Sequence, residues 1–287
     1  MLYLSFFSFP DIEQEYDFRM LKMRRTCYNS MYPFFILSSR NLTKLKFEPV
    51  TIFYGGNGSG KTTALNVIAE KLQLSRDSLY NRSSFFEDYL SYCYYDVCRA
   101  IPTMSRIITS DDVFDFMLNV RSLNESIDRK REELFQEYMD AKYSQFQVRS
   151  LDDYEQLTKV CEARGKSQSK FVDKRLMENM QEHSNGESGF LYFINKIQEG
   201  GLYLLDEPEN SLSPEKQLEL RKFLEDNVRF FNCQFIIATH SPFLLSLREA
   251  KIYDFDADPV DVRKWYELKN VRTYYDFFQR HKTEFES

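Results

Sequence analysis

A glycine-rich segment of the chain contains the residue types that bind a polyphosphate. Residues 55–62 read Gly-Gly-Asn-Gly-Ser-Gly-Lys-Thr and fit the pattern G-x-x-x-x-G-K-[S/T]. Glycines let backbone N–H groups approach phosphate oxygens, and a helix N-terminus adds partial positive charge at the same point. The lysine reaches the β- and γ-phosphates, and the hydroxyl after it binds Mg²⁺. The expected ATP-binding residues are therefore Gly55, Gly56, Asn57, Gly58, Ser59, Gly60, Lys61, Thr62 and Thr63.

Two carboxylates end a second apolar segment further along the chain. Leu202-Tyr-Leu-Leu205 is followed by Asp206 and Glu207. At such a strand end an aspartate holds Mg²⁺ opposite Thr62, and an adjacent carboxylate accepts the proton of the attacking water. We therefore expect Thr62 and Asp206 as metal ligands, and Glu207 and Lys61 as catalytic residues. The alternative is a strand followed by an acidic turn, which the phosphate loop in the same chain disfavours.

The elements that must position these residues follow an alternating strand and helix pattern. Strands are expected at 34–37, 50–54, 202–205 and 235–238, with helices from Lys61 and over 214–228. Continuous apolar strands separated by helices predict a mostly parallel sheet with helices on both faces, an α/β fold of the P-loop NTPase class. The charge-rich residues 113–180 are expected to form a helical insertion lobe within a single domain spanning 1–287. Their charge runs indicate either a solvated surface or a surface that contacts a partner or nucleic acid.

Composition excludes several classes of protein. The 38 Lys and Arg against 44 Asp and Glu give a net charge of −6, which does not support nucleic-acid binding. The five cysteines form no CxxC pair and indicate reduced thiols, and three histidines are too few for a His-rich metal centre. Residues 1–10 lack the basic start of a signal peptide and are expected to form a first strand. No apolar run is long enough to span a bilayer, so we expect a cytoplasmic protein.

The order of the motifs resembles that of ABC-type ATPases. After the phosphate loop come Ser184-Asn-Gly-Glu-Ser188, the acidic pair, and Ala238-Thr-His-Ser241. Lys61, Ser184, Asp206 and His240 follow one another at separations of 123, 22 and 34 residues, as in that family. The chain is more similar to SMC/RecF-like and bacterial AAA-21-like ATPases than to transporter subunits. The resemblance covers about 45–75 and 180–256, and Glu187 replaces the second glycine of the usual signature motif.

The resemblance implies a nucleotide-sandwich homodimer. Ser184 and Gly186 of one subunit would contact the γ-phosphate held on the phosphate loop of the other. His240 would bind the γ-phosphate and hold the attacking water; the alternative is a strand-end histidine satisfied by the backbone. For the glutamine loop of the family the best candidate is Asp112, which would take the Mg²⁺/water role. An equally good interpretation makes residues 110–112 a helix start capped by Ser110.

The function that these residues predict is Mg²⁺-dependent ATP hydrolysis that drives or restrains a protein effector. The resemblance implies that such small ATPases work beside a nuclease or toxin in phage defence. Two alternatives are an ATP-binding regulatory module with slow hydrolysis and the nucleotide-binding subunit of an ABC transporter. Arg40, Asn41 or an aromatic residue among 32–35 could contact adenine. Residues 270–285 carry apolar side chains at helical spacing and are expected to form a packing helix, with an interface role as the other interpretation.

Overall fold

Two compact units make up the chain. The structure, a computed structural model, describes residues 1–22, 30–144, 154–173 and 185–286. One unit consists of Met1–Phe114 with Asn185–Ser287, and the other of Asp115–Ser184. The first unit holds both sheets and every phosphate-loop residue, whereas the described residues of the second are mainly helical.

A six-stranded sheet forms the centre of the first unit. Its order is β5-β6-β7-β3-β8-β9, and every pair is parallel except β8 with β9. Every residue of β3, β6 and β7 is buried, as expected for strands that are covered on both faces. The predicted mostly parallel α/β sheet is therefore confirmed. The strands are β3 (Val50–Tyr54), β5 (Arg106–Thr109), β6 (Leu202–Asp206), β7 (Gln234–Ala238), β8 (Lys251–Asp254) and β9 (Asp261–Arg263).

Helices α2 and α8 contact this sheet directly. Helix α2 begins after the phosphate loop and contacts β5, β6 and β7, while α8 contacts β7. Ser213 caps α8 by accepting a hydrogen bond from the Lys216 N–H, and Pro214 occupies its first position. The helices of this part are α2 (Lys61–Lys71), α7 (Asn185–Lys196), α8 (Pro214–Phe230) and α9 (Pro242–Leu245).

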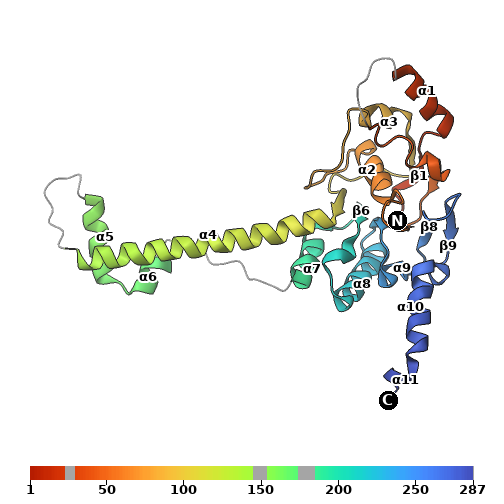
Figure 1. Ribbon diagram of the computed structural model, residues 1–287. Helices are drawn as coiled ribbons and strands as arrows, with labels where there is room; N and C mark the ends of the chain where they lie inside the picture. Colours follow the sequence, from red (N-terminus) through yellow and green to blue (C-terminus); the bar gives the residue numbers. More distant parts are fainter. Residues whose placement is uncertain (23–29, 145–153, 174–184, 287) are drawn as a thin grey trace. The chain divides into compact units, whose positions relative to one another are not determined.

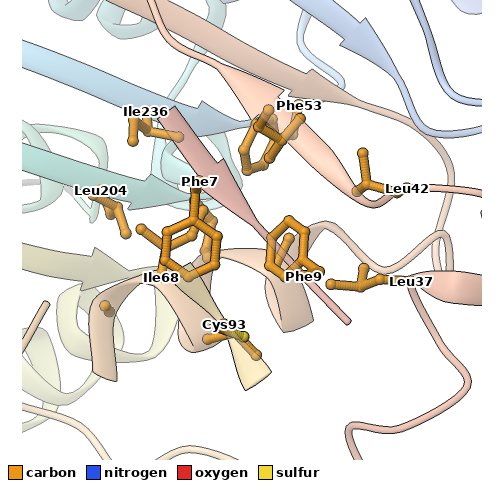
Figure 2. Packing of buried hydrophobic residues seen from close by; sticks show 14 of the residues in the cluster. Phe7, Phe9, Leu37, Leu42, Phe53, Ile68, Cys93, Leu204 and Ile236 are labelled. Carbon is orange, nitrogen blue, oxygen red and sulfur yellow. The ribbon is translucent and has the colours of Figure 1, made fainter. Parts of the chain in front are cut away.

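A second, three-stranded antiparallel sheet shares a buried core with α2 and the six-stranded sheet, and the sequence did not predict it. Its order is β2-β1-β4. Phe7 of β1, Phe53 of β3 and Ile68 of α2 belong to one buried cluster (Figure 2). Strand β1 confirms the strand expected within residues 1–10. This part contains β1 (Leu4–Ser8), α1 (Ile12–Lys22), β2 (Lys44–Lys46), α3 (Phe86–Tyr92) and β4 (Tyr94–Val97).

The strand expected at 34–37 is wrong. The segment forms turns, in which the Phe34 N–H donates to the Met31 carbonyl at 2.9 Å and the Phe35 N–H to the Glu15 carboxylate at 2.8 Å. Phe34 and Leu37 are buried nonetheless. An apolar run predicts burial, but here the backbone polar groups are satisfied by a turn and a buried side chain instead of a neighbouring strand.

The described part of the second unit is made of three helices, of which α4 has its first five residues, Ser110–Phe114, in the first unit. They are α4 (Ser110–Tyr143), α5 (Tyr154–Gly165) and α6 (Gln168–Asp173), and Figure 1 shows α5 and α6 beside one end of the long α4. Leu134 and Tyr138 of α4 pack with Ala163, Phe171 and Val172 in a small core. The helical character expected for this region is confirmed for the described residues. Its assignment as a lobe inserted at 113–180 within one domain stays a prediction.

The last helices expose their aromatic residues. They are α10 (Lys269–Arg280) and α11 (Lys282–Phe285), and they confirm the expected helical tail. Val271 is buried, whereas Tyr274, Tyr275 and Phe278 remain about half exposed. The expectation of a packing helix is therefore wrong beyond the first turn of α10, because α10 extends past the elements that could cover it (Figure 1).

Two further sequence expectations concern thiols and membrane spans. The described cysteines, Cys93, Cys98, Cys161 and Cys233, are free thiols. Among the residues that the structure describes, no helix is both long and apolar enough to cross a membrane.

Gln234 joins the two sheets through its side chain. It is fully buried at the start of β7. Its Oε1 accepts the N–H groups of Tyr3 at 2.7 Å and Leu4 at 2.9 Å, and its Nε2 donates to the Leu4 carbonyl at 2.8 Å. One amide side chain thereby satisfies three backbone groups at the start of β1.

Replacing this amide tests the connection. Gln234→Leu introduces an apolar side chain of similar size and leaves the backbone groups of Tyr3 and Leu4 buried without these partners. We expect the free energy of unfolding, measured by urea denaturation, to fall by about 2–5 kcal/mol. Gln279→Ala, at an exposed position of α10, should change it by less than about 0.5 kcal/mol. Equal unfolding midpoints for the two variants would contradict the proposed role of Gln234.

Candidate functional site

The predicted site residues meet at one edge of the six-stranded sheet. Strands β6, β7 and β3 are parallel neighbours, so their carboxyl ends lie side by side. Ala238 at the end of β7 pairs with Asp206 on one side and with Phe53 on the other. The phosphate loop, the acidic pair and His240 each begin within two residues of these strand ends. The sheet thus brings together segments that are far apart in the sequence.

Close packing of neighbouring side chains explains two glycines of the phosphate loop. A Cβ on Gly55 would lie 2.7 Å from the Ser59 Oγ and 3.1 Å from the Phe255 Cβ. Gly60 has a φ of +98° and precedes the first residue of α2, and its Cβ would approach Leu37 to 3.1 Å. A side chain at either position would force these neighbours to shift, and at Gly60 it would also strain the backbone. The sequence pattern therefore has a steric basis in this structure.

The phosphate loop presents buried polar groups that fit an anionic ligand. The Lys61 ammonium is 3% exposed and donates to the carbonyls of Gly55 at 2.7 Å and Gly56 at 3.0 Å. The Ser59 Oγ is buried and has no hydrogen-bond partner. A buried hydroxyl without a partner is costly unless a ligand supplies one. The loop thus offers a donor and a cation in the position where its sequence pattern predicts phosphate.

Thr62 and Asp206 lie in contact across the sheet edge. The Thr62 hydroxyl donates to Asp206 Oδ1 at 3.2 Å. Burial raises the pKa of Asp206 to about 6, and the Thr62 hydrogen bond opposes this shift. Among the described residues no group of three or more His, Cys, Asp or Glu side chains could hold a metal by itself. A hydroxyl and one carboxylate fit Mg²⁺, which takes few protein ligands and completes its shell with water and phosphate.

Glu207 points toward both the lysine and the histidine. Its backbone adopts a left-handed conformation with φ +48°, and its N–H donates to the Ala238 carbonyl at 2.9 Å. One carboxylate oxygen lies 3.8 Å from the Lys61 Nζ and 4.0 Å from the His240 Nδ1. The other oxygen accepts a hydrogen bond from the Asn210 amide at 3.0 Å. The Glu207 side chain is 24% exposed, so water can reach it.

The structure places His240 at the sheet edge beside two carboxylates. Its side chain is 46% exposed, and its Nδ1 lies 3.4 Å from Glu209 Oε1. Glu209 also accepts a hydrogen bond from the backbone N–H of His240. This contact is compatible with the alternative interpretation, a strand-end histidine that local contacts hold in place. The γ-phosphate role of His240 is also compatible with this geometry, because the exposed ring lies 4.0 Å from Glu207.

Three further residues, none of them predicted as a site residue, contribute to this edge. Glu209 is 6% exposed and holds the turn after β7. Asp256 accepts the Gly56 N–H with both carboxylate oxygens, at 2.9 and 3.0 Å, and so fixes the phosphate loop. The Asn270 amide donates to the His240 carbonyl at 2.6 Å. Of these three residues, only Glu209 has a local signal in the sequence, because it follows the acidic pair Asp206-Glu207 by two residues.

Of the two predicted signature residues, the structure describes one. Ser184 lies outside the described residues. Gly186 lies in the first turn of α7, which begins at Asn185. Thr63, the last predicted nucleotide-binding residue, is buried, and its Oγ1 accepts a hydrogen bond from the Tyr32 hydroxyl at 3.4 Å. The roles of these residues toward ATP stay predictions.

The start of α4 corrects one expectation for residues 110–112. Asp112 Oδ2 accepts hydrogen bonds from the N–H and the hydroxyl of Thr109 at 2.6 and 3.0 Å, and the Asp112 N–H donates to the Thr109 hydroxyl at 3.3 Å. This reciprocal arrangement is a capping box, so Thr109 and not Ser110 caps the helix. Asp112 Oδ1 is buried and has no hydrogen-bond partner. The Mg²⁺/water role of Asp112 stays a prediction.

A pocket of about 400 Å³ opens beside Thr62 and Asp206, with Tyr32 and Thr109 in its lining. Tyr32 thus lies on the Thr62 and Asp206 side of the phosphate loop. Phe34, another residue considered for adenine, is buried in the core and has no face to offer a base. The side chain of Asn41, also considered for adenine, donates a hydrogen bond to the Asp258 carboxylate at 3.1 Å.

The sequence matches two known families. The pattern of the family described as "ABC transporter" matches residues 42–210, more than half of the chain. The pattern of AAA_21, described as "AAA domain, putative AbiEii toxin, Type IV TA system", matches residues 183–246. No curated protein matches the chain.

Several solved structures are similar at low identity. The SMC head domain from Thermotoga maritima is 12% identical with a TM-score of 0.41, over 92% of this chain and 99% of that chain. An SMC head domain from Pyrococcus furiosus, bound to the C-terminal domain of ScpA, is 13% identical with a TM-score of 0.38, over 83% and 95%. A dimeric ATP-binding cassette bound to ADP and Pi is 12% identical with a TM-score of 0.37, over 78% and 90%.

The family match over 42–210 contains both the phosphate loop and the acidic strand end. The AAA_21 match contains the segment from the signature to the turn after His240, as the AAA-21-like resemblance predicts. The chain therefore belongs to the ABC family of P-loop ATPases.

Proposed function

We propose that this chain is a Mg²⁺-dependent ATPase that hydrolyses ATP to ADP and phosphate. The observation that supports this most strongly is the meeting of Lys61, Thr62, Asp206 and Glu207 at one sheet edge, within 4 Å of one another in pairs. A phosphate-binding loop, a metal-binding pair and a carboxylate that water can reach are the parts that phosphoryl transfer to water requires.

The phosphate loop binds the triphosphate in this proposal. Its backbone N–H groups and the unpartnered Ser59 hydroxyl donate to phosphate oxygens. The Lys61 ammonium, which donates to the loop carbonyls of Gly55 and Gly56, neutralises charge on the β- and γ-phosphates. Asp256 keeps the loop in place from the side of β8 by holding the Gly56 N–H.

Thr62 and Asp206 would hold the metal. Bound Mg²⁺ neutralises charge on the β- and γ-phosphate oxygens. The ligand-free pair is already in contact, so its oxygens are positioned for a common partner. Binding a cation also favours the ionised form of Asp206, whose pKa burial raises in the ligand-free chain.

Glu207 acts as the general base. The water oxygen attacks the γ-phosphorus, the bond to the β-phosphate oxygen breaks, and the water proton moves to the Glu207 carboxylate. The Asn210 amide holds one carboxylate oxygen and leaves the other facing the Lys61 and His240 side. His240 binds the γ-phosphate and holds the attacking water.

The second part of the proposal is a dimer that acts on a protein effector. Ser184 and Gly186 of a second copy would complete each ATP site, as the motif order of the family implies. An effector such as a nuclease or toxin would then respond to opening and closing of the pair. The net charge of −6 favours a protein over a nucleic acid as that partner.

Glu207→Gln tests the general base. The amide keeps the shape of the side chain but cannot accept the proton, so we expect kcat to fall at least about 100-fold while ATP still binds. Steady-state phosphate release and binding of a fluorescent ATP analogue measure the two effects. Glu219→Gln, an exposed carboxylate change on α8, is the matched control and should keep the wild-type kcat. Undiminished hydrolysis by the Glu207 variant would exclude this role.

Asp206→Asn tests the buried carboxylate through pH. Burial raises the pKa of Asp206 from 3.8 to about 6, so ionisation of the ligand-free folded chain above pH 6 opposes folding. A shift of about two units corresponds to about 3 kcal/mol. We expect the variant to be more stable than wild type by up to about 3 kcal/mol at pH 8, with the difference shrinking from pH 6 toward pH 4. Urea denaturation at several pH values measures this.

The same variant should show the opposite effect once ligands are added. With Mg²⁺ and ATP, wild type should gain thermal stability and Asp206→Asn much less, because the amide is a poor metal ligand. Asp276→Asn, on the exposed face of α10, controls for the loss of one charge. A pH-independent stability difference would contradict the buried carboxylate.

Light scattering after size-exclusion chromatography tests the dimer. Glu207→Gln with ATP and Mg²⁺ should elute at twice the monomer mass, because ATP stays bound and hydrolysis does not reopen the pair. Lys61→Ala should remain monomeric under the same conditions, because it lacks the cation that binds the triphosphate. A monomer in both cases at saturating ATP would rule out the sandwich.

A further inference from the structure

We propose that Glu209 is a positioning residue that sets the place of His240 in the catalytic site, and that Asn270 holds the same turn from its other side. This inference rests on the proposed ATPase function. It assigns a task to two residues that are not among the predicted nucleotide-binding or catalytic residues.

Glu209 organises the turn that carries His240. A single oxygen, Oε1, accepts hydrogen bonds from the Thr239 hydroxyl at 2.7 Å, the His240 N–H at 2.9 Å and the Ser241 N–H at 3.2 Å. The same oxygen lies 3.4 Å from the His240 Nδ1. Three consecutive residues therefore wrap around one carboxylate oxygen. Hydrogen bonds from N–H groups to a carboxylate are stronger than neutral ones, so this turn is tightly held.

Burial makes these contacts hard to replace. Glu209 is 6% exposed, and its Oε2 is buried and has no hydrogen-bond partner. Without Glu209, the N–H groups of His240 and Ser241 lose the acceptor that they share, and Ser241 is itself only 4% exposed, so the turn would rearrange toward other acceptors. The imidazole is carried on this backbone and would move with it.

Asn270 holds the opposite side of the turn. Its side-chain amide donates to the His240 carbonyl at 2.6 Å, and its own N–H donates to the Tyr54 hydroxyl at 3.2 Å. Tyr54 ends β3, the strand that leads into the phosphate loop. The backbone N–H of His240 is thus held by Glu209 and its carbonyl by Asn270. Glu209 follows β6 and Asn270 is bonded to Tyr54 of β3, so the turn is tied to both strands that flank β7.

The position of His240 matters because catalysis depends on sub-ångström placement. A displacement of about 1 Å can lower a rate about 100-fold even when no reacting group is lost. Neither Glu209 nor Asn270 contacts the phosphate loop in the described structure, so we expect them to affect kcat and not the binding of ATP.

A double-mutant cycle tests the inference. Glu209→Ala should lower kcat about 10- to 100-fold with the dissociation constant for ATP unchanged within about twofold. Glu209→Gln keeps the accepting oxygen and should recover kcat to within about tenfold of wild type. Adding Glu209→Ala to His240→Ala should slow hydrolysis no further, because Glu209 acts through His240. Asn270→Ala should give a smaller loss of kcat, and it keeps the inference testable if Glu209→Ala does not fold.

Histidine NMR gives a readout that does not depend on hydrolysis. The chain has three histidines, His183, His240 and His281, and the His240 ring signal is identified by its loss in His240→Ala. Glu209→Ala should shift this signal. Glu225→Ala is the matched control, because Glu225 also accepts a turn N–H, that of Arg248 at 3.2 Å. It should leave both the signal and kcat unchanged.

The outcomes separate the two proposals. An unmoved His240 signal together with wild-type kcat in Glu209→Ala would overturn the inference while the ATPase stands. Multiplicative losses in the double variant would also overturn it, because Glu209 would then act independently of His240. A shifted signal in a chain that does not hydrolyse ATP would refute the proposed function and leave the positioning of His240 by Glu209 supported.

Discussion

Charge confined to a buried sheet edge is the constraint on which the rest of this structure depends. The Lys61 ammonium and the Asp206 carboxylate are each less than 9% exposed, and both lie beside Glu207. A buried charge is unfavourable unless it is paired or hydrogen-bonded. The loop carbonyls hold the lysine, and burial raises the pKa of Asp206. An anionic ligand accompanied by a divalent cation would balance both groups at once.

The surrounding architecture keeps this edge rigid. Strands β3, β6 and β7 are buried along their whole length, and the cluster that includes Phe7, Phe53 and Ile68 packs α2 against both sheets. The Gln234 amide ties the start of β1 to β7. Because the strands cannot separate, the loops at their carboxyl ends can be organised by a few side chains. Asp256 fixes the phosphate loop, and Glu209 fixes the turn after β7.

The sequence predicts the structure correctly where a short pattern of residues requires one backbone conformation. It does not where an apolar run can be buried in more than one backbone conformation. The phosphate loop, the acidic pair and the parallel strands combine a local pattern with a required spacing. The apolar run at 34–37 predicts burial correctly but not backbone conformation, because a turn and Glu15 can satisfy its N–H groups as well as a strand can. The aromatic spacing of α10 predicts a helix correctly, but whether another element covers its apolar residues is decided elsewhere in the chain.

The sequence by itself determined the α/β class, the residues of the phosphate loop and the acidic pair, because each follows from short-range steric and hydrogen-bonding requirements. Only the tertiary structure decided that Asp256 meets Gly56 across 200 residues and that Asn270 and Glu209 meet at the His240 turn from 30 and 31 residues away. Such contacts arise when packed strands bring their ends to a common edge. A single carboxylate or amide in the sequence gives no sign of which distant backbone group it will find there.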